Sequence, residues 1–232
     1  MALVKPDHKR GKICLDRGIS ECKFEIHLPD PRYDGGGQAT IKQFLRDSNI
    51  LSKLNATESI MEMCCGYGGI GYYLAYKLNL KKAIFVDIDG GAAEGIELNK
   101  SVVNFDTEFY ESSAFNSYTG PKVDLIVTNP PHVTTEEELT KIQNDLWGGN
   151  MPEDRKVRSR LILLDKDFEF HTNFCRDAHL YLNDGGQIVF FENESFIPNQ
   201  RIKDTLGEGY SYELIIRPPY QPQMYMLIAT KL

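Results

Sequence analysis

The sequence lacks long apolar runs, cysteine pairs and an excess of positive charge. No stretch of about 18 apolar residues is present, so we expect no transmembrane helix. The first ten residues lack the apolar core of a signal peptide. The cysteines number 5 and include no Cys-x-x-Cys pair, which argues against a disulfide framework and fits a reducing cytoplasm. The net charge of −7 argues against a protein whose main task is to grip a phosphate backbone, although it permits a local basic groove.

One histidine–cysteine group is a candidate metal site. His171, Cys175 and His179 fall four residues apart and would share one face of a helix. Phe168 and Phe174 lie among them, and no fourth ligand is evident, whereas a structural zinc ion takes four. We therefore expect partly buried helix residues here and no metal.

Apolar strand patterns alternate with amphipathic helical patterns along most of the 232 residues. The expected strands are 24–28, 59–64, 83–86, 107–110, 123–127, 187–192, 212–217 and 224–230, and the expected helices are 38–54, 72–78, 90–102, 165–182 and 201–206. Residues 183–186 should form a turn. Successive strand–helix units predict an α/β fold with a doubly wound parallel sheet that binds ligands at the carboxyl ends of its strands. The last two strands predict an antiparallel hairpin at the sheet edge.

A glycine-rich loop follows the strand 59–64 and precedes a helix. Residues 65–71 read Cys-Gly-Tyr-Gly-Gly-Ile-Gly. Glycines let the backbone approach a ligand closely, and the N-terminus of the next helix adds a positive dipole end. Asp87 ends the next strand about twenty residues later, where a carboxylate can accept hydrogen bonds from ribose hydroxyls. The two features together predict a site for a nucleotide-type ligand.

The strand 123–127 runs into an unusual loop, Asn129-Pro130-Pro131-His132. Each proline fixes φ and removes a backbone donor, and Pro130 keeps Asn129 out of the α region. The loop should therefore be stiff and should present two acceptors, the side-chain oxygen of Asn129 and the carbonyl of Pro130. Two fixed acceptors suit a planar NH2 group, whose two hydrogens need two partners, and they would steer its lone pair toward an electrophile.

The alternative interpretation of this loop is a strand stopped by proline and followed by a simple turn. However, Glu62, Asp87 and Asn129 all fall at the carboxyl ends of predicted strands. In a doubly wound sheet these ends meet at one edge. Their convergence favours a functional loop.

The segment 133–164 is polar and then mixed in character. A long insertion at this position would overhang the site and help to select the substrate. Its basic run 155–160 is a candidate contact for an anion, although such a cluster is more often a solvated helix face. Trp147, the sole tryptophan, either covers a substrate or packs within the fold.

Together these residues resemble a class I S-adenosyl-L-methionine-dependent methyltransferase. The run from Glu62 to Gly68 resembles the acid-x-Gly-x-Gly-x-Gly signature, with Cys64 in place of its first glycine, and Asp87 matches the ribose-binding acid. Residues 129–132 resemble the Asn-Pro-Pro-aromatic signature of enzymes that methylate planar nitrogens. The chain is most similar to the glutamine-amide methyltransferases that act on peptide release factors, and to the related small-domain RNA methyltransferases.

The resemblance implies a seven-stranded, mostly parallel, Rossmann-like sheet in a methyltransferase domain at 35–232, preceded by an extension at 1–34. It implies S-adenosyl-L-methionine as cofactor and methyl transfer to a planar nitrogen, with a protein side-chain amide as the favoured acceptor. The cofactor-binding residues that it implies are Glu62, Cys64, Gly66, Gly68, Asp87, Ser113, Ala114 and Asn129. The implied catalytic residues are Asn129, Pro130 and His132, and the implied acceptor contacts are Pro131, His132 and Trp147.

The chain departs from the family pattern in ways that bear on its acceptor. His132 stands where tyrosine is usual, and the N-terminal helical domain that engages the release factor has no expected equivalent. The acid usual near the adenine amine is replaced around Ser113 and Ala114, so an adenine contact would come from backbone or hydroxyl groups there.

Other functions stay open at this stage. A nucleic-acid base would require a basic groove, and a small metabolite with an amide, amine or guanidine is a further possible acceptor. A nicotinamide-dependent oxidoreductase would share the glycine loop and the acid but would leave the Asn-Pro-Pro loop unexplained. The last alternative is a non-catalytic module that binds the cofactor. The sequence does not indicate an oligomeric state.

Overall fold

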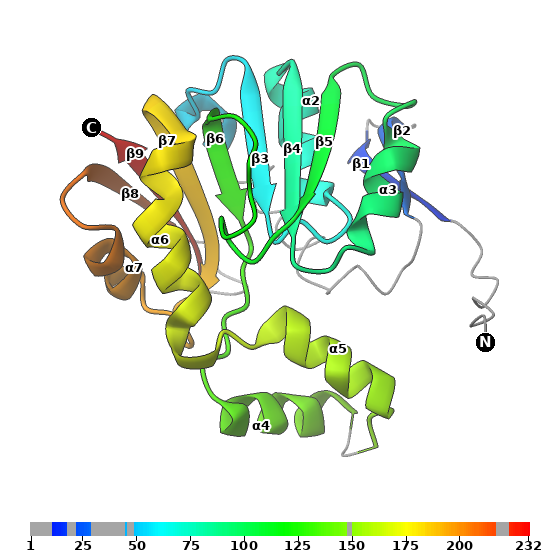
Figure 1. The fold of residues 1–232 in the computed structure, drawn as a ribbon, viewed down its shortest axis with the longest axis vertical. Helices are drawn as coiled ribbons and strands as arrows, with labels where there is room; N and C mark the ends of the chain where they lie inside the picture. Colours follow the sequence, from blue (N-terminus) through cyan, green and yellow to red (C-terminus); the bar gives the residue numbers. More distant parts are fainter. Residues whose placement is uncertain (1–10, 18–21, 29–44, 46–48, 148–149, 217–222) are drawn as a thin grey trace.

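The computed structural model describes residues 11–17, 22–28, 45, 49–147, 150–216 and 223–232 (Figure 1). A seven-stranded sheet forms its centre, in the order β5-β4-β3-β6-β7-β9-β8. The strands are β3 (Ser59–Met63), β4 (Lys82–Asp87), β5 (Asp106–Glu111), β6 (Val123–Thr128), β7 (Leu182–Asn193), β8 (Tyr210–Ile216) and β9 (Met224–Lys231). Strands β5, β4, β3, β6 and β7 are parallel, whereas β9 and β8 are antiparallel. The predicted fold class is therefore confirmed, and so is the C-terminal hairpin.

Helices cover both faces of this sheet. The helical elements are η2 (Ile50–Lys53), α2 (Gly69–Leu78), α3 (Ala92–Asn99), α4 (Glu136–Trp147), α5 (Glu153–Leu163), η3 (Lys166–Phe168), α6 (Glu169–Tyr181) and α7 (Asn199–Leu206). A separate antiparallel pair, β1 (Gly11–Arg17) and β2 (Cys22–Leu28), precedes the sheet, and it confirms the strand predicted at 24–28. Among the described helices, none has both the length and the apolar character needed to cross a bilayer.

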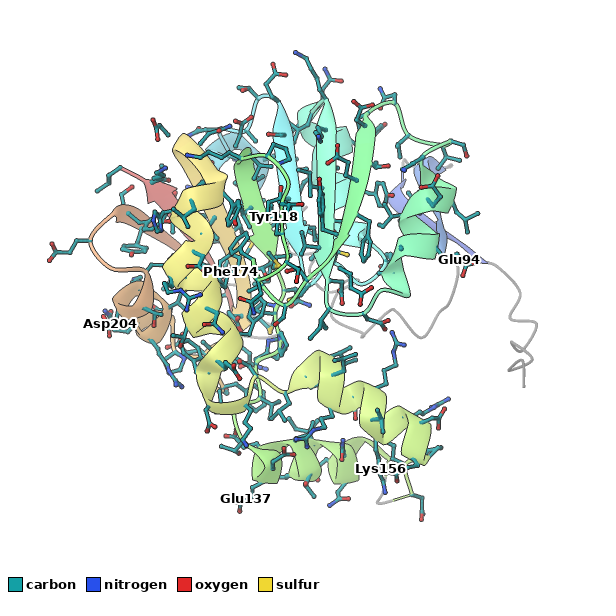
Figure 2. All side chains as sticks on the ribbon, in the orientation of Figure 1. Glu94, Tyr118, Glu137, Lys156, Phe174 and Asp204 are labelled. Atoms are coloured by element: carbon teal, nitrogen blue, oxygen red, sulfur yellow. The ribbon has the colours of Figure 1, made fainter. Side chains whose placement is uncertain are left out.

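The alternation of side chains along each strand builds two hydrophobic cores. On β7, Val189 and Phe191 face the core that contains buried residues of α2 and α3, and Ile26 of β2 is buried there as well. Ile188 and Phe190 face the other core, which contains buried residues of α6 and α7. In Figure 2, Phe174 marks the face of α6 that packs against this second core. Both faces of the central strands are therefore buried, as their continuous apolar runs predict.

The strand order places the candidate site at a topological switch point. Strand β3 lies between β4 and β6, so the chain leaves β3 toward one side of the sheet and later returns on the other. The carboxyl ends of these parallel strands share one edge. Ligands of doubly wound sheets bind in the crevice outside such an edge.

The opposite edge is fixed by the side chain of Asp124. Its Oδ2 accepts hydrogen bonds from the backbone N–H groups of Thr57 (3.3 Å), Glu58 (2.8 Å) and Ser59 (3.1 Å). Its Oδ1 accepts one from Nδ2 of Asn183, at 2.7 Å. Burial raises the pKa of Asp124, but these hydrogen bonds outweigh burial and leave the pKa below its usual value. One carboxylate therefore joins the starts of β3, β6 and β7.

The structure corrects several predicted elements. Residues 183–186 do not form a separate turn, because β7 runs through them, with an irregular register opposite β6. The predicted helix 165–182 begins only at Glu169, after the short helix η3. Most of the predicted helix 38–54 lies outside the described residues, and its end is a 3-10 helix rather than an α-helix. The segment 133–164 contains α4 and α5, which form a helical hairpin.

Candidate cofactor and acceptor site

The glycine-rich loop leaves β3 with three residues in the left-handed conformation. They are Cys64 (φ 59°), Gly66 (φ 53°) and Gly68 (φ 80°). A Cβ at Gly68 would lie 2.7 Å from the ring of Phe85 and 2.9 Å from that of Tyr72, so glycine is required there by space as well as by φ. Helix α2 begins at Gly69, three residues earlier than the sequence pattern predicts. Its N-terminus therefore follows the loop directly.

Cys64 takes a conformation that glycine adopts more readily, at the position where the resembled signature has glycine. We expect Cys64→Gly to change the free energy of unfolding by less than about 1 kcal/mol, because relief of the left-handed strain offsets the greater entropy of the unfolded chain. Cys64→Val should cost about 2 kcal/mol, since a β-branched residue is strained at positive φ. Urea unfolding of both variants tests this. Equal losses in the free energy of unfolding would show that the positive φ at residue 64 does not decide which side chain is tolerated there.

Glu62 supports the loop from behind. Its side chain is 1% exposed, and its Oε2 accepts a hydrogen bond from the N–H of Gly71 in the first turn of α2, at 2.7 Å. A Cβ at Gly71 would lie 2.9 Å from the same oxygen. A carboxylate here accepts a hydrogen bond from a backbone N–H that the helix itself leaves unpaired. Its negative charge also interacts favourably with the positive N-terminal end of the helix dipole. The geometry gives Glu62 a positioning role, and its predicted contact with the cofactor stays a prediction.

Asp87, at the end of β4, connects the glycine loop to its neighbours. Its Oδ2 accepts the N–H of Gly66 at 2.8 Å, and its Oδ1 accepts the N–H of Asp89 at 2.9 Å. Burial raises the pKa of Asp87, and these two hydrogen bonds offset the rise only in part. Each carboxylate oxygen has a second lone pair, so the group retains acceptors for a ribose diol.

The segment after β5 lies beside Asp87. The N–H of Ser112 donates to the backbone oxygen of Asp87 at 2.8 Å, and the N–H of Asn116 donates to that of Ser113 at 3.1 Å. Ala114 has φ 47° and a buried side chain that packs in the second core, whereas Ser113 is exposed. A ligand at this turn would meet the backbone of Ala114 rather than its methyl group. The adenine contact predicted here stays a prediction.

The Asn-Pro-Pro loop lies next to the glycine loop. Thr128 pairs with Met63 in the parallel ladder, so Asn129 and Cys64 leave adjacent strands at the same level. Pro130 is buried, whereas Asn129 is half-buried. The sheet therefore brings together the three predicted strand ends that carry Glu62, Asp87 and Asn129, which confirms their predicted convergence.

His132 begins a chain of hydrogen bonds that the sequence patterns did not predict. Its Nδ1 lies 3.2 Å from Oε2 of Glu192, the buried acid near the end of β7. Oε1 of Glu192 lies 2.8 Å from Nε2 of His171 on α6, and Nδ1 of His171 lies 2.6 Å from Oδ2 of Asp165. The ring of His132 also stacks on Phe196, with centroids 6.4 Å apart. A four-residue acid–base chain therefore ends at the candidate acceptor site.

Charge within this chain stabilises its ionised forms. Burial lowers the pKa of His171, but the carboxylates of Glu192 and Asp165 outweigh burial and raise the pKa to about 9. Burial raises the pKa of Glu192, but His171 and His132 outweigh it and leave the pKa below its usual value. Near neutral pH, His171 is therefore a cation between two carboxylates.

His171, Cys175 and His179 do not converge on one point. His171 is held between Asp165 and Glu192, Cys175 is buried in the second core, and His179 is exposed. Within the described ranges, no group of at least three His, Cys, Asp or Glu side chains is arranged to hold a metal ion. The predicted placement of these residues on a partly buried helix is confirmed.

The helical hairpin of α4 and α5 lies beyond the carboxyl edge of the sheet (Figure 1). Its two helices are joined by a hydrogen bond from Gln143 Nε2 to Ser159 Oγ at 2.8 Å and by an ion pair between Arg160 and Glu136. In Figure 2, Lys156 marks α5 and Glu137 marks α4. The side chain of Trp147, at the end of α4, lies outside the described part of the chain, so its predicted role stays a prediction.

One basic residue of the hairpin faces the cofactor region. Nη2 of Arg158 lies 3.6 Å from Oδ2 of Asp89, two residues after Asp87, and its positive charge lowers the pKa of Asp87. Arg155 and Arg160 are exposed, as expected for a solvated helix face. Arg158 is the exception, because its side chain is only 25% exposed. The hairpin therefore contacts the loop that follows Asp87.

Comparison with known proteins supports the class that the fold and the site indicate. Residues 41–148 match the model of the methyltransferase small domain family. The chain is 31% identical to a release factor glutamine methyltransferase of Borreliella burgdorferi over 119 residues, which are 50% of this chain and 39% of that enzyme. It thus spans well under half of that relative's length. A second relative is a Methanocaldococcus jannaschii protein whose name describes it as a proposed protein N5-glutamine methyltransferase. It is 28% identical over 160 residues, which are 69% of this chain and 74% of the relative.

Solved structures share the fold at low sequence identity. A methyltransferase from Pyrococcus furiosus gives a TM-score of 0.56 at 18% identity and covers 84% of this chain and 82% of its own. A T. thermophilus 16S rRNA N2 methyltransferase, in complex with AdoMet and guanosine, gives 0.54 at 16% identity, with 90% and 47% coverage. The predicted resemblance to class I methyltransferases is confirmed. The family match, the glycine loop and Asp87 agree with S-adenosyl-L-methionine as the cofactor.

Proposed function

We propose that this protein transfers a methyl group from S-adenosyl-L-methionine to a side-chain amide nitrogen of a protein acceptor. The observation that carries the proposal is the position of Asn129 and Pro130, at the end of β6 and beside the glycine loop of β3. This is where a held amide nitrogen would meet a methyl donor bound at the carboxyl ends of β3 and β4.

The residues present fit this cofactor. Asp87 offers carboxylate lone pairs to the ribose hydroxyls, and the backbone of the loop that contains Gly66 and Gly68 offers close approach. Ser113 and Ala114 would supply backbone or hydroxyl contacts to the adenine. When bound, the cofactor supplies a methyl group on a positively charged sulfur, so the donor is already activated.

The Asn-Pro-Pro loop positions the acceptor. The side-chain oxygen of Asn129 and the carbonyl oxygen of Pro130 each accept one hydrogen of the acceptor NH2 group. Holding both hydrogens turns the nitrogen lone pair out of conjugation and toward the donor. Orientation of this kind contributes several kcal/mol, up to about 7–11 in the best cases, to lowering a barrier. Pro131 would cover the planar group, and His132 would face its nitrogen.

A protein acceptor is favoured by the surface of α5. Val157 is 64% exposed, Leu161 is 40% exposed and Ile162 is 38% exposed. Apolar side chains gathered on one exposed helix near a candidate site fit contact with another polypeptide better than enclosure of a small metabolite. The net charge of −7 is also unfavourable for a nucleic-acid acceptor. The two curated relatives named above as glutamine methyltransferases agree with this choice.

The test supplies methyl-labelled S-adenosyl-L-methionine and a cell extract separated into protein, nucleic-acid and small-molecule fractions. Label in the protein fraction, mapped by mass spectrometry to a glutamine or asparagine side chain, is the expected result. Label in nucleic acid would replace the proposal with a base methyltransferase, and label only in small molecules would replace it with a metabolite enzyme. Cofactor binding without any label would point to a binding module, and a lack of cofactor binding would overturn the site itself.

A further inference from the structure

In the four-residue hydrogen-bonded chain behind the Asn-Pro-Pro loop, only the residue at the site is exposed to solvent. The side chain of His132 is 22% exposed, whereas those of Glu192 and His171 are fully buried and that of Asp165 is 1% exposed. The members come from the loop after β6, from β7, from α6 and from the residue before η3. The chain therefore links the acceptor loop to the interior of the second core.

Hydrogen-bond chemistry fixes the protonation of its inner members. Carboxylate oxygens only accept, and both ring nitrogens of His171 face carboxylate oxygens, so both nitrogens carry hydrogens. Asp165 Oδ1 also accepts a hydrogen bond from the backbone N–H of Phe170, at 2.6 Å. The stacked ring of Phe168, with its centroid 4.5 Å from that of His171, keeps the pair away from water.

The same rule fixes the tautomer of His132. Oε2 of Glu192 accepts, so Nδ1 of His132 must donate and carry the hydrogen of the neutral ring. Its Nε2 is then left with a lone pair. Among the described residues, none is hydrogen-bonded to Nε2, and the ring is partly exposed at the acceptor loop.

We propose that the buried Asp165–His171–Glu192 chain holds His132 with its hydrogen on Nδ1, and that Nε2 of His132 accepts the proton lost by the methylated nitrogen. The inference rests on the proposed function for its substrate. In this step one of the two hydrogens held by Asn129 and Pro130 turns to His132. The N–H bond of the cationic, newly methylated nitrogen breaks and its electron pair returns to nitrogen, while the proton bonds to Nε2. The imidazolium faces the Glu192 carboxylate at Nδ1, and it returns the proton to solvent through its exposed edge.

His132 is the catalytic residue in this proposal, and the other three are positioning residues. Three buried ionised groups are costly to desolvate, and apolar residues of similar volume often stabilise a fold as well or better. Burial of these charges is therefore poorly explained by stability alone. A hydrogen-bonded carboxylate commonly fixes the tautomer and orientation of a histidine at a reactive site.

The first test reads the tautomer directly, without substrate. The sequence has only 5 histidines, so 15N-histidine labelling gives few signals, which His132→Phe and His171→Phe assign. We expect the hydrogen of the neutral His132 ring on Nδ1, and hydrogens on both ring nitrogens of His171. In Glu192→Gln the preference of His132 for Nδ1 should be lost. A wild-type His132 protonated at Nε2 would overturn the proposal, whatever the methyl acceptor proves to be.

The second test measures turnover. His132→Phe keeps a ring for stacking but removes the proton acceptor, and we expect kcat to fall about 100-fold with little change in the KM for the cofactor. Glu192→Gln should lower kcat about tenfold. The other titratable groups near the chain, whose pKa values its charges affect, are Cys64, Cys175 and Tyr225.

Cys175→Ala is the matched control. Cys175 is buried one helical turn after His171, and its thiol makes no hydrogen bond to Asp165, His171, Glu192 or His132. The variant should keep kcat within about twofold. A His132→Phe variant with the wild-type rate would remove the proton-acceptor role. Failure of the wild type to methylate any fraction would instead count against the proposed function. The tautomer measurement would still show whether Glu192 holds His132 with its hydrogen on Nδ1.

Discussion

Replacing Asn129 with alanine should abolish methyl transfer and leave the affinity for S-adenosyl-L-methionine within about tenfold of wild type. The variant keeps the stiff proline loop and the carbonyl of Pro130 but loses one of two acceptors for the NH2 group. The acceptor nitrogen can then stay conjugated and point away from the donor. Loss of one such polar contact typically costs 10²–10³ in kcat, and loss of orientation adds to it. Initial rates with labelled cofactor and calorimetric Kd values give the two quantities.

Asn55→Ala provides a matched control for this variant. Asn55 is exposed, and its backbone N–H bonds to Gln187 toward the opposite edge of the sheet. Its loss should leave both turnover and cofactor affinity unchanged. If Asn129→Ala weakened cofactor binding and turnover in parallel, the assigned division of labour between Asn129 and Asp87 would be wrong.

Glu192→Ala should lower the free energy of unfolding by about 3–5 kcal/mol, the cost of breaking a buried ion pair from one side. His171 then keeps only Asp165 as a charged partner, and a cavity replaces the carboxylate. Urea unfolding monitored by circular dichroism measures the loss. Glu208→Ala, at an exposed glutamate, should stay within about 0.5 kcal/mol of wild type. A loss from Glu192→Ala as small as this control would show that the chain contributes little net stability.

The same chain should make stability depend on alkaline pH. The pKa of His171 is about 9 in the folded protein against an ordinary 6.5, so its contribution is fully present below pH 6.5 and is lost as pH rises through 9. The shift corresponds to about 3 kcal/mol. His171→Gln should remove this part of the pH dependence between pH 6.5 and pH 9.5. Parallel stability curves for wild type and variant would mean that the charge on His171 is not linked to folding.

Local patterns were sufficient for most of the fold. Buried parallel strands appear as short apolar runs, and the glycine loop has a sequence signature because Gly68 has no room for a side chain. Asp87 and Asn129 were found for the same reason, since each directly follows or ends such a run. The order of the strands, in contrast, was not predicted, because it depends on pairing between segments that are distant in the sequence.

The features missed by the sequence depend on contacts between distant segments. Glu192 lies at or near the carboxyl end of a strand, as Glu62 and Asp87 do, and this shared position is a signal within the sequence. The role of His171 is set by residues 6 and 21 positions away, on other elements, whereas helical spacing pointed to Cys175 and His179. The register between β6 and β7 is likewise a pairing of distant strands, whereas the local pattern at 183–186 predicts a turn.

The base of the α4–α5 hairpin is closed by its own backbone. The N–H of Val133 donates to the carbonyl of Leu163 at 2.9 Å, and the N–H of Asp165 donates to that of Val133 at 2.8 Å. The chain therefore leaves and re-enters the domain at nearly one point. An exposed segment bounded in this way can lengthen, shorten or be exchanged while β6 and α6 keep their positions. Residues 134–162 could thus be replaced as one unit without rebuilding the sheet, and under the proposed function such a replacement would be the route to a different acceptor.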